Sequence, residues 1–486
     1  RKKVILFCYD KEEYLKERGL YFDYNDLPFT KVENVDELIK ALNNDKQYNE
    51  SEFINQFCKY DSNDVTKKIC SKFILGQNSD LVIENIKDNK KDNILIYTGN
   101  LDKNGITSSL RNLLFAIDTN EKNYYLTFSA PKIKKNKEQL LTFPENVKYI
   151  STMGKTNMNL IQKIEITLYR KNLIPQFLIN KLVKNVYPYE IKRLYGDINF
   201  NTVIQFGGYE YKKNLMFSQF PCNKVIYVHS DMVNEIKLKN NQHWKTLNYA
   251  YNHYNKVAIV TEGMRDSVYK ISKKNDNIHV AENIINYKSV EEKSRLDLIK
   301  FDEKTESTVT LEKLEDILNS DKKKIITIGR FSPEKGHDRL IKSFNKLYKE
   351  NKNVELIIIG GAGNQYESTL QLVQQLPSRN NIILIKDMSN PFTILKKCDY
   401  FILTSLYEGF GLVVAEADIL NKPVISTDIP GIRSFMKKNN GTLVENTEEG
   451  IYKGLEMLIN NKVKVMNVDY EKYNKNAIKE FYELLD

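Results

Sequence analysis

The sequence of 486 residues lacks the features that mark membrane-spanning or disulfide-bonded proteins. No stretch approaches the ~18 consecutive apolar residues that a membrane-spanning helix needs, and no basic-then-apolar secretory leader opens the chain. The five cysteines, Cys8, Cys58, Cys70, Cys222 and Cys398, are scattered and include no C-x-x-C pair. These absences argue against membrane channels, disulfide scaffolds and zinc ribbons, and they predict a reducing, cytoplasmic location.

The chain also lacks a repeat of the 20–50-residue kind that builds solenoids. It begins Arg-Lys-Lys-Val-Ile without a methionine, so we expect it to be a fragment of a longer protein. Hydrophobic residues make up 41% and charged residues 28% of the chain, which permits large cores and argues against wholesale disorder. At one domain per ~150 residues, the length predicts about three domains.

Positive charge exceeds negative charge along the chain. Lys and Arg number 73 against 63 Asp and Glu, a formal net charge of +10. Such a surplus favours anionic partners: phosphate polymers, nucleotides, nucleic acid or an acidic membrane face. Solubility of a Lys- and Asn-rich protein explains the surplus equally well, so charge alone leaves both interpretations open.

Hydrophobic patterning predicts three units. Residues 1–75 form a small appendage with a strand at Val4–Cys8 and helices at Val35–Leu42 and Glu52–Phe57, too little for a free-standing catalytic domain. The polar residues 76–92 are expected to act as a connector. The larger units are residues 93–286 and residues 323–486, separated by a charged interdomain insert at residues 287–322.

Both larger units alternate apolar strands with amphipathic helices, the pattern of a parallel sheet covered on both faces. The predicted fold class is therefore α/β, with two Rossmann-like units in tandem and a small α/β appendage before them. The strands expected are Ile94–Tyr97, Tyr124–Phe128, Thr202–Gln205, Lys224–Val228, Lys256–Thr261, Ile325–Ile328, Leu356–Ile359, Ile382–Ile385, Tyr400–Leu403 and Pro423–Ser426.

One stretch of the first large unit, Lys171–Leu194, alternates Lys and Arg with Leu, Ile, Val and Tyr. It fits an amphipathic helix pair packed on the core, or helices that touch a membrane or a polyanion. Because Pro175 and Pro188 would break a long surface helix, we favour packing on the core.

The segment from residue 398 to residue 416 carries the strongest chemical signal. A strand ends near Ser405, a loop holds Glu408-Gly-Phe-Gly411, and a helix begins beside Gly411. The glycines let a ligand approach the backbone, and the helix start offers unpaired N–H groups and a positive dipole end to an anion. Glu408 lies nearest any reacting group, and Glu416, in the second helical turn, is placed to accept from sugar hydroxyls. The alternative is a strand-turn-helix with two solvated carboxylates and no ligand.

A second motif, Gly329-Arg-Phe-Ser-Pro-Glu-Lys-Gly-His337, directly follows the strand Ile325–Ile328. Arg330 and Lys335 would lie at the carboxyl edge of the sheet, where open α/β folds bind ligands. Two cations there suit a diphosphate, Arg through its planar fork and Lys as a point charge. An Arg and a Lys around a surface proline turn are common, so the motif gains weight from the glutamate segment on the same edge.

Both motifs resemble segments of the retaining nucleotide-sugar glycosyltransferases of family four, whose GT-B fold has two Rossmann-like domains facing across a cleft. The similarity spans about residues 93–486 and is most specific in the C-terminal half. There it comprises Gly329-Arg-Phe, Glu334-Lys-Gly, the pair Glu408 and Glu416 around Glu-Gly-Phe-Gly, Asn421–Thr427 and Pro430-Gly431. Looser matches in the first half are Val228–Asp231, Thr261–Arg265 and Asn283.

The resemblance implies roles for these residues. It makes Arg330 and Lys335 ligands of the donor diphosphate and Glu416 the ligand of the ribose hydroxyls. Glu408 holds the sugar, and His229 contacts the sugar from the opposite domain, although a histidine of the core is the alternative for His229. The backbone amides that complete the donor site are those of Gly409, Phe410, Gly411 and Leu412.

The glycine loop departs from the family pattern, because Asn104-Gly105-Ile-Thr-Ser replaces the usual paired glycines. Whether Gly105 serves the donor or the acceptor therefore stays open. No second carboxylate offers itself as a covalent nucleophile in the first domain, which favours front-face displacement by the acceptor. The cations and the helix start would stabilise the leaving diphosphate, so no metal ion or other cofactor is expected.

The first 75 residues resemble the C-terminal tail of CDP-glycerol glycerophosphotransferases, enzymes that polymerise glycerol phosphate chains of the teichoic-acid type. The matching segments are Tyr9–Asp23, Asp26–Pro28, Val35–Ile39 and Phe57–Asp61. The family's catalytic histidines are absent from this stretch, so we expect no such activity here. With the missing methionine, the resemblance implies the glycosyltransferase end of a bifunctional bacterial capsule or teichoic-acid polymerase. A chance acidic-aromatic turn is the alternative.

Taken together, the sequence predicts a retaining hexosyltransferase that uses a nucleotide sugar, expected to be UDP-linked, and a glycerol-phosphate or polyol-phosphate acceptor. Lys132–Lys137 and Lys171–Arg193 are candidate surfaces for that polyanion. The expected location is cytoplasmic, with peripheral contact to the inner face of the membrane left open. Alternatives are a lipid-linked sugar or a protein as acceptor, or a non-catalytic scaffold that binds polymer. Nucleic acid is not expected, because no recognition helix or stacking platform accompanies the charge.

Overall fold

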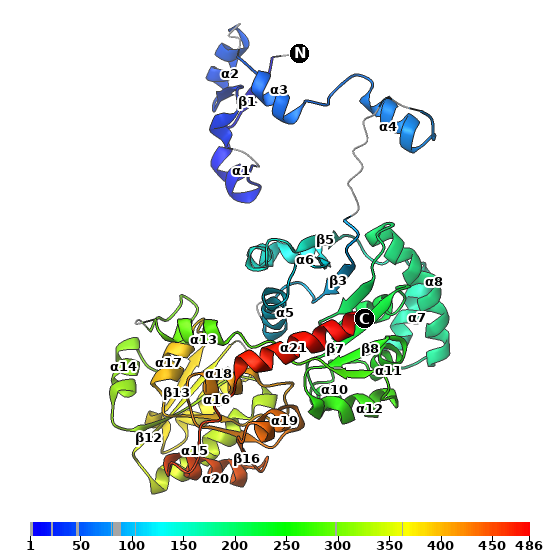
Figure 1. Cartoon of the computed structure of the whole chain (residues 1–486). Coiled ribbons are helices and arrows are strands. Elements are labelled where there is room, and N and C mark those ends of the chain that lie inside the picture. Colours follow the sequence, from blue (N-terminus) through cyan, green and yellow to red (C-terminus); the bar gives the residue numbers. More distant parts are fainter. Residues whose placement is uncertain are drawn as a thin grey trace. The chain divides into compact units, whose positions relative to one another are not determined.

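The computed structural model divides the chain into two units, residues 1–89 and residues 90–486 (Figure 1). It describes residues 3–20, 23–44, 48–78, 80, 89–102, 104–296, 299–361 and 363–486. Most of the predicted connector, residues 79 and 81–88, lies outside the described residues. The predicted α/β class is confirmed, because the second unit contains two seven-stranded sheets.

The first unit has a very small core. Its two strands, β1 (Ile5–Phe7) and β2 (Thr30–Val32), pair in parallel, and among its described residues only Val32 is buried. A short chain buries little apolar surface, as expected for a unit of this length. Its α-helices are α1 (Lys11–Glu17), α2 (Val35–Leu42), α3 (Ser51–Phe57) and α4 (Val65–Phe73).

The first sheet of the second unit is entirely parallel, with strand order β5-β4-β3-β6-β7-β8-β9. Its strands are β3 (Asn93–Tyr97), β4 (Asn123–Ser129), β5 (Lys148–Thr152), β6 (Thr202–Gln205), β7 (Asn223–Val228), β8 (Lys256–Ile259) and β9 (Ile278–Val280). The α-helices between them are α5 (Gly105–Ala116), α6 (Ala130–Ile133), α7 (Leu160–Arg170), α8 (Gln176–Tyr195), α9 (Tyr211–Phe217), α10 (Met232–Lys239), α11 (Trp244–His253) and α12 (Arg265–Ser272).

The second sheet has the order β10-β13-β12-β11-β14-β15-β16, and only the edge strand β10 is antiparallel to its neighbour. Its strands are β10 (Glu306–Ser307), β11 (Lys323–Ile328), β12 (Val354–Gly360), β13 (Ile382–Lys386), β14 (Tyr400–Leu403), β15 (Val424–Thr427) and β16 (Thr442–Val444). The accompanying α-helices are α13 (Tyr287–Ser294), α14 (Leu311–Asn319), α15 (His337–Glu350), α16 (Tyr366–Gln374), α17 (Phe392–Lys397), α18 (Leu412–Ile419), α19 (Pro430–Lys438), α20 (Glu448–Ile459) and α21 (Tyr470–Leu485).

The central strands are apolar because they are covered on both faces. β12 is buried along its whole length, and Ile357 pairs with Ile326 of β11 and Ile383 of β13. On its other side β11 pairs with β14, Ile325 opposite Tyr400. Both neighbours of β11 are parallel to it, so the loops that follow β11 and β14 leave the sheet at the same edge.

Helix α21 ties the end of the chain back to the first sheet, beside β7 and β8 (Figure 1). The Asn223 side-chain amide donates to the Leu484 carbonyl at 2.8 Å, and Lys256 Nζ donates to the Glu483 carbonyl at 2.6 Å. On the same helix, the side chain of Asn474 exchanges two hydrogen bonds of 2.9 Å with the backbone of Ile285. The chain therefore passes between the two domains twice.

Two expectations about the helices and the insert are wrong. Pro188 lies inside the 20-residue helix α8 and does not end it, because the solvent-exposed side of a helix tolerates the local loss of one hydrogen bond. The stretch predicted as an interdomain insert, residues 287–322, is partly built into the second domain, since β10 pairs with β13 there. Packing of α8 on the core, through Leu182, Val183 and Val186, agrees with the favoured interpretation.

Asp418 of α18 fixes the second crossing between the domains. Its buried carboxylate accepts hydrogen bonds from the backbone N–H groups of Met466, Asn467 and Val468 at 3.0–3.1 Å. It also accepts from the Tyr470 hydroxyl at 2.9 Å. These bonds set the direction in which α21 starts.

We expect Asp418→Ala to lower the free energy of unfolding by about 3 kcal/mol, because it leaves buried N–H donors without acceptors. Thermal unfolding followed by circular dichroism measures this. The matched control is Asp316→Ala on the exposed side of α14, which should change stability by less than about 0.5 kcal/mol. Equal melting of Asp418→Ala and the wild type would contradict the role given to this carboxylate.

Candidate functional site

The strand order of the second sheet brings the two motifs together. Lys335, in the turn after β11, hydrogen-bonds through Nζ to Oε1 of Glu408, in the loop after β14. Ser405 Oγ donates to the same Oε1 at 2.7 Å. The side chains of Lys335 and Glu408 are only 15% and 13% exposed, so water screens their attraction weakly.

The backbone of the turn is locked against the loop after β14. Leu406 N–H donates to the Glu334 carbonyl at 2.7 Å, and Thr404 Oγ1 donates to the Lys335 carbonyl at 3.1 Å. Gly336 has φ +64°, and a Cβ there would lie 2.5 Å from the Thr404 carbonyl oxygen. The turn therefore needs a glycine at this position to approach the strand end so closely.

His337 supports the start of the same motif. Its Nε2 donates to the carbonyls of Gly329 and Arg330, at 3.2 Å each. Burial lowers the pKa of His337 to about 4, so the imidazole is neutral at pH 7. Sequence analysis gave no role to this histidine, which holds the Arg330 backbone in place.

Helix α18 begins in the loop that carries Glu408. Gly411, with φ +67°, precedes Leu412, and no side chain caps the helix start. The first N–H groups of a helix have no intrahelical partner, so this end attracts an anion. Glu416 lies one turn further on, half-buried, and burial raises its pKa to about 7 against the opposing charge of Lys293.

His229 faces this loop from the first domain, directly after β7. Its Nε2 donates to the Phe206 carbonyl at 2.8 Å, which leaves Nδ1 as an acceptor. The ring stacks on Tyr227 with centroids 5.6 Å apart. Burial lowers the pKa of His229 to about 4, so this side chain is a neutral hydrogen-bonding group.

The two domains touch through glycine backbones next to the site. A Cβ on Gly409 would lie 1.9 Å from the carbonyl oxygen of His229, and a Cβ on Gly263 would lie 1.7 Å from that of Pro430. No side chain fits at either position. The structure thus brings His229 to the Glu408 loop, across the boundary between the domains.

Arg330 has different partners from Lys335. Its guanidinium is 63% exposed and donates to Glu334 Oε1 at 3.1 Å. Lys239 of α10, in the first domain, contacts the same oxygen at 3.0 Å and Glu235 at 3.3 Å. Burial alone would raise the pKa of Glu334, but its hydrogen bonds and Lys239 lower it below the ordinary value. Glu235 and Lys239 could not be predicted from the sequence, because no motif links α10 to the turn after β11.

Gly105 lies apart from these contacts. It is the first residue of α5, which Asn104 caps by accepting from the Thr107 N–H at 3.0 Å. Nothing in the described structure lies within 4 Å of the position that a Cβ would take on Gly105. Open space therefore surrounds this helix start, and the structure assigns Gly105 to neither substrate.

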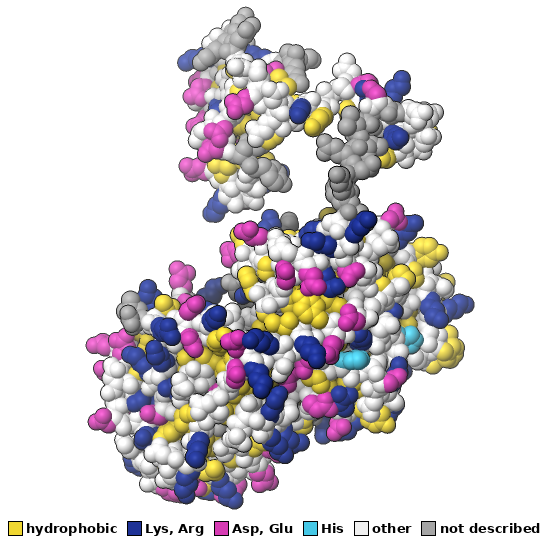
Figure 2. Space-filling view, viewed as in Figure 1, with side chains coloured by type: hydrophobic (Ala, Val, Ile, Leu, Met, Phe, Trp, Pro, Cys, Tyr) yellow, Lys and Arg dark blue, Asp and Glu magenta, His cyan; other side chains and the backbone are white. Residues whose placement is uncertain are grey.

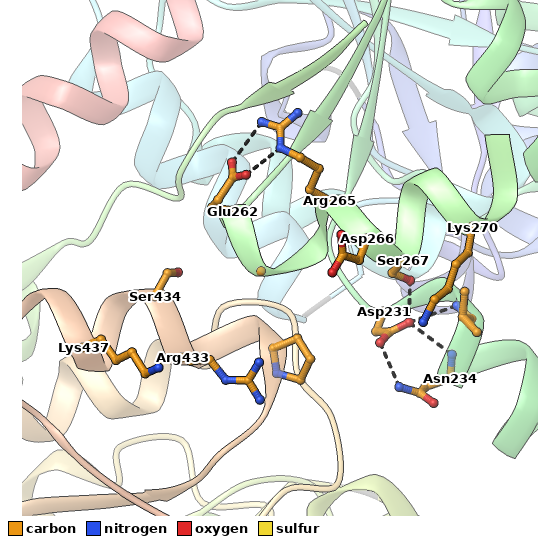
Figure 3. Close-up of a pocket in the computed structure, with 13 residues that line it drawn as sticks. Asp231, Asn234, Glu262, Arg265, Asp266, Ser267, Lys270, Arg433, Ser434 and Lys437 are labelled. Carbon is orange, nitrogen blue, oxygen red and sulfur yellow. Dashed lines mark hydrogen bonds and ion pairs between the residues drawn. The ribbon is translucent and has the colours of Figure 1, made fainter. Parts of the chain in front are cut away.

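Figure 3 shows a further cavity of about 470 Å³ between the domains. Residues of both resemblance segments, Thr261–Arg265 and Pro430-Gly431, stand around it, and Arg433 and Lys437 of α19 face α12 of the first domain. Two of its acidic groups are already hydrogen-bonded: Glu262 pairs with Arg265, and Asp231 accepts from Ser267 at 2.6 Å. The cavity is lined by other residues than the Lys335–Glu408 site.

The Lys335–Glu408 site suits a ligand with a negative group and hydroxyls. Lys335, Arg330 and the start of α18 offer positive charge, and the carboxylates of Glu408 and Glu416 accept hydrogen bonds. Within the described ranges, no three His, Cys, Asp or Glu side chains gather where they could hold a metal ion.

Comparison with protein families gives two matches. Residues 311–480 match the family described as Glycosyl transferases group 1, and residues 1–75 match CDP-Glycerol:Poly(glycerophosphate) glycerophosphotransferase. Among curated proteins, the capsular polysaccharide biosynthesis glycosyltransferase CapM of Staphylococcus aureus is 33% identical over 140 residues. That alignment covers 28% of this chain and 36% of CapM, and the first matching relatives are covered over only 25% to 40% of their length.

Solved structures resemble a much larger part of the chain. Alr3699/HepE of Anabaena, in complex with UDP and glucose, superposes with a TM-score of 0.58 over 81% of this chain and 99% of its own, at 13% identity. A TarM variant of S. aureus, in complex with fondaparinux, alpha-GlcNAc-glycerol and UDP, gives 0.57 over 81% and 100%, at 17% identity. At such low identity, these likenesses show the fold.

The comparisons confirm both resemblances drawn from the sequence. The family match over residues 311–480 covers the motifs of the C-terminal half, and the match over residues 1–75 covers the glycerophosphotransferase-like segments. The looser motifs of the first half, at Val228–Asp231, Thr261–Arg265 and Asn283, lie outside the family match. The second unit has the GT-B fold, residues 311–480 within it match the group 1 glycosyltransferases, and residues 1–75 match the glycerophosphotransferase family.

Proposed function

We propose that this chain is a retaining glycosyltransferase. It transfers a hexose from a UDP-sugar to a glycerol-phosphate or polyol-phosphate acceptor during synthesis of a capsule or teichoic-acid-like polymer. The enzyme works in the cytoplasm, with peripheral contact to the inner face of the membrane. The observation that carries the proposal is the contact between Lys335 and Glu408 beside the uncapped start of α18.

The charges of this site favour one orientation of the donor. Its diphosphate would take Lys335 Nζ away from Glu408 and lie at the start of α18, with Arg330 on the open side. Glu408, released from Lys335, would then accept from sugar hydroxyls, and Glu416 from the ribose. His229 would contact the sugar from the first domain, through the free lone pair on Nδ1.

Electrostatic stabilisation of the leaving group accounts for the catalysis. As the bond from the anomeric carbon to the phosphate oxygen breaks, negative charge grows on the diphosphate. Lys335, Arg330 and the N–H groups that follow Gly411 lie where that charge develops. The departing oxygen then accepts the proton of the acceptor hydroxyl, so neither a metal ion nor a protein nucleophile is needed.

The related proteins favour these substrates. HepE and TarM are described with UDP, and TarM also with alpha-GlcNAc-glycerol, a sugar linked to a polyol. CapM is a glycosyltransferase of capsule synthesis, and the tail of this chain matches a glycerophosphotransferase family. A surplus of 10 positive charges suits an acceptor that carries a phosphate in every unit.

Two other functions differ in their observable consequences. A transferase for a lipid-linked sugar or a protein would use the same donor site with a different acceptor. A non-catalytic scaffold would bind nucleotide sugar or polymer without turnover. Release of nucleoside diphosphate that depends on added acceptor separates an enzyme from a scaffold. The presence of Arg330, Lys335, Glu408 and Glu416 together disfavours the scaffold.

We expect Arg330→Ala and Lys335→Ala each to lower turnover by roughly a hundredfold or more, since each removes a preorganised charge worth about 2.7–4 kcal/mol in the transition state. Acceptor-dependent release of nucleoside diphosphate measures turnover, and circular dichroism checks folding. Lys342→Ala on α15 is the matched control, because its half-exposed side chain pairs with Glu448 at 3.5 Å. Wild-type turnover in both Arg330→Ala and Lys335→Ala would contradict the proposal that these two residues bind the diphosphate.

The KM for long glycerol phosphate oligomers should rise steeply with salt, because screening weakens the attraction between a polyanion and a basic surface. The KM for the donor should rise less, since its charged groups are held in a partly buried site. Initial rates at increasing NaCl, with each substrate varied in turn, test this. A KM for the acceptor that does not change with salt would point to a neutral glycan or protein acceptor.

The product should keep the anomeric configuration of the donor, because the acceptor attacks from the side on which the diphosphate leaves. Glu408→Gln should be slower and give the same anomer, since Glu408 only positions the sugar. NMR of the product reads the linkage, and intact-mass spectrometry looks for sugar bound to the protein. A β-linked product from an α-linked donor would rule out retention, and a covalent adduct would reject front-face displacement.

A further inference from the structure

The helical hairpin α7–α8 exposes large apolar side chains on its outer face. Helix α7 and helix α8 pack together, joined by the turn at residues 171–175. Six large apolar side chains of this hairpin are between 41% and 74% exposed: Leu160, Ile161, Ile164, Leu173, Phe177 and Leu178. We call them the hairpin surface.

These side chains cannot turn inward, because the opposite faces of both helices already pack on the core. Helix α7 buries Ile166 and Tyr169, and helix α8 buries Ile179, Leu182 and Val183 among others. At 3.6 residues per turn, Leu160, Ile161 and Ile164 lie on the side of α7 away from Ile166 and Tyr169, and Phe177 lies on the side of α8 away from Ile179. Leu173 lies in the turn between the helices. The hairpin is thus apolar on two faces, one of which has no partner among the described residues of the second unit.

Positive charge surrounds the hairpin surface. Between residues 155 and 195 the sequence has eight Lys and Arg against two Glu, and one of these, Glu190, is buried and paired with Arg193 at 2.8 Å. Figure 2 shows dark blue and yellow side chains together along the edge where Figure 1 places α7 and α8. All eight cations are exposed: Lys155, Lys163, Arg170, Lys171, Lys181, Lys184, Lys192 and Arg193.

The turn of the hairpin is held firmly and lies beside an aromatic side chain. Lys245 Nζ donates to the Ile174 carbonyl at 3.2 Å, and His243 contacts the Asn172 side chain at 3.0 Å. Between them stands Trp244, 40% exposed and the only tryptophan of the chain. Tryptophan is enriched where proteins meet the headgroup region of a membrane.

We propose that the hairpin surface docks on a membrane that contains anionic lipid, with the six apolar side chains among the acyl chains and the lysines at the headgroups. Among the described residues, no helix is long and apolar enough to cross a bilayer, so the contact lies in the interface. The inference deepens the peripheral membrane contact of the proposed function by naming its surface, and its test does not depend on the transfer reaction, since binding to lipid requires no donor.

The composition of the surface favours lipid over other occupants. A polyol-phosphate chain would pair with the lysines but would leave the apolar side chains in water. A second copy of the chain would bring the two sets of lysines together, and like charges across an interface repel. A bilayer with anionic headgroups satisfies both parts of the surface at once.

The test is co-sedimentation of the full chain with phosphatidylcholine vesicles that contain or lack phosphatidylglycerol, with Trp244 fluorescence as a second readout. We expect binding and a blue shift with phosphatidylglycerol only, and weaker binding at high salt. Leu173→Glu with Phe177→Glu should abolish both signals. Lys181→Gln with Lys184→Gln should weaken binding roughly 25-fold, about fivefold for each charge. Leu141→Glu, at an 88% exposed residue outside the hairpin, is the control and should bind as the wild type does.

Both pairs of substitutions change outward-facing side chains, so circular dichroism should show folded protein. Absence of vesicle binding by the wild type would overturn the proposal, as would equal binding by the wild type and both hairpin variants. Loss of a dimer in the Leu173/Phe177 variant, without a change in vesicle binding, would identify the surface as a protein contact instead. Loss of binding to glycerol phosphate oligomers alone in the lysine variant would identify it as an acceptor surface.

Discussion

The ion pair between Lys335 and Glu408 is the contact on which the rest of the site depends. The two residues are 73 positions apart, and they meet only because β14 pairs with β11 in the middle of the second sheet. Gly336, in the left-handed region, and the buried His337 fix the loop after β11 against the loop after β14, at one edge of the sheet. A partly buried ammonium and carboxylate attract each other strongly when nothing else is bound. A ligand that takes this lysine must therefore bring negative charge of its own.

The boundary between the domains is the second constraint. Gly409 and Gly263 allow the backbones of the two domains to touch. The Lys239–Glu334 ion pair joins side chains across the same boundary, and Asp418 fixes the chain segment that leads into α21. His229 reaches the Glu408 loop only because of this close approach. Residues of both domains thus lie around the Lys335–Glu408 site, and Arg330 shares its partner Glu334 with a lysine of the opposite domain. A diphosphate bound at Arg330, as proposed, would therefore compete for the carboxylate that pairs with Lys239 of the first domain.

Much of this arrangement could be predicted from the sequence, and the failures have physical causes. The central strands were predicted because burial on both faces makes them continuous apolar runs, as in β12. The strands missed in the two seven-stranded sheets, β5, β9, β10 and β16, are the edge strands of those sheets, where short and half-exposed strands carry no such signal. The motif residues Arg330, Lys335, Glu408 and Glu416 fell on one sheet edge because parallel strands end together. Lys239 and Glu235 escaped notice, because a contact between domains leaves no local pattern in either segment. The prediction that Pro188 breaks the helix was wrong, since a proline on the solvent side of a helix need not end it.

The most direct test of the proposed transfer reaction is to identify its product. The full chain is incubated with a panel of nucleotide sugars and a synthetic glycerol phosphate oligomer, and the oligomer is analysed by mass spectrometry. We expect one donor, a UDP-hexose, to add a single hexose to the oligomer and to release an equal amount of UDP. An oligomer that stays unchanged with every donor, although UDP binds to the protein, would contradict transfer to this acceptor and leave a binding function in its place.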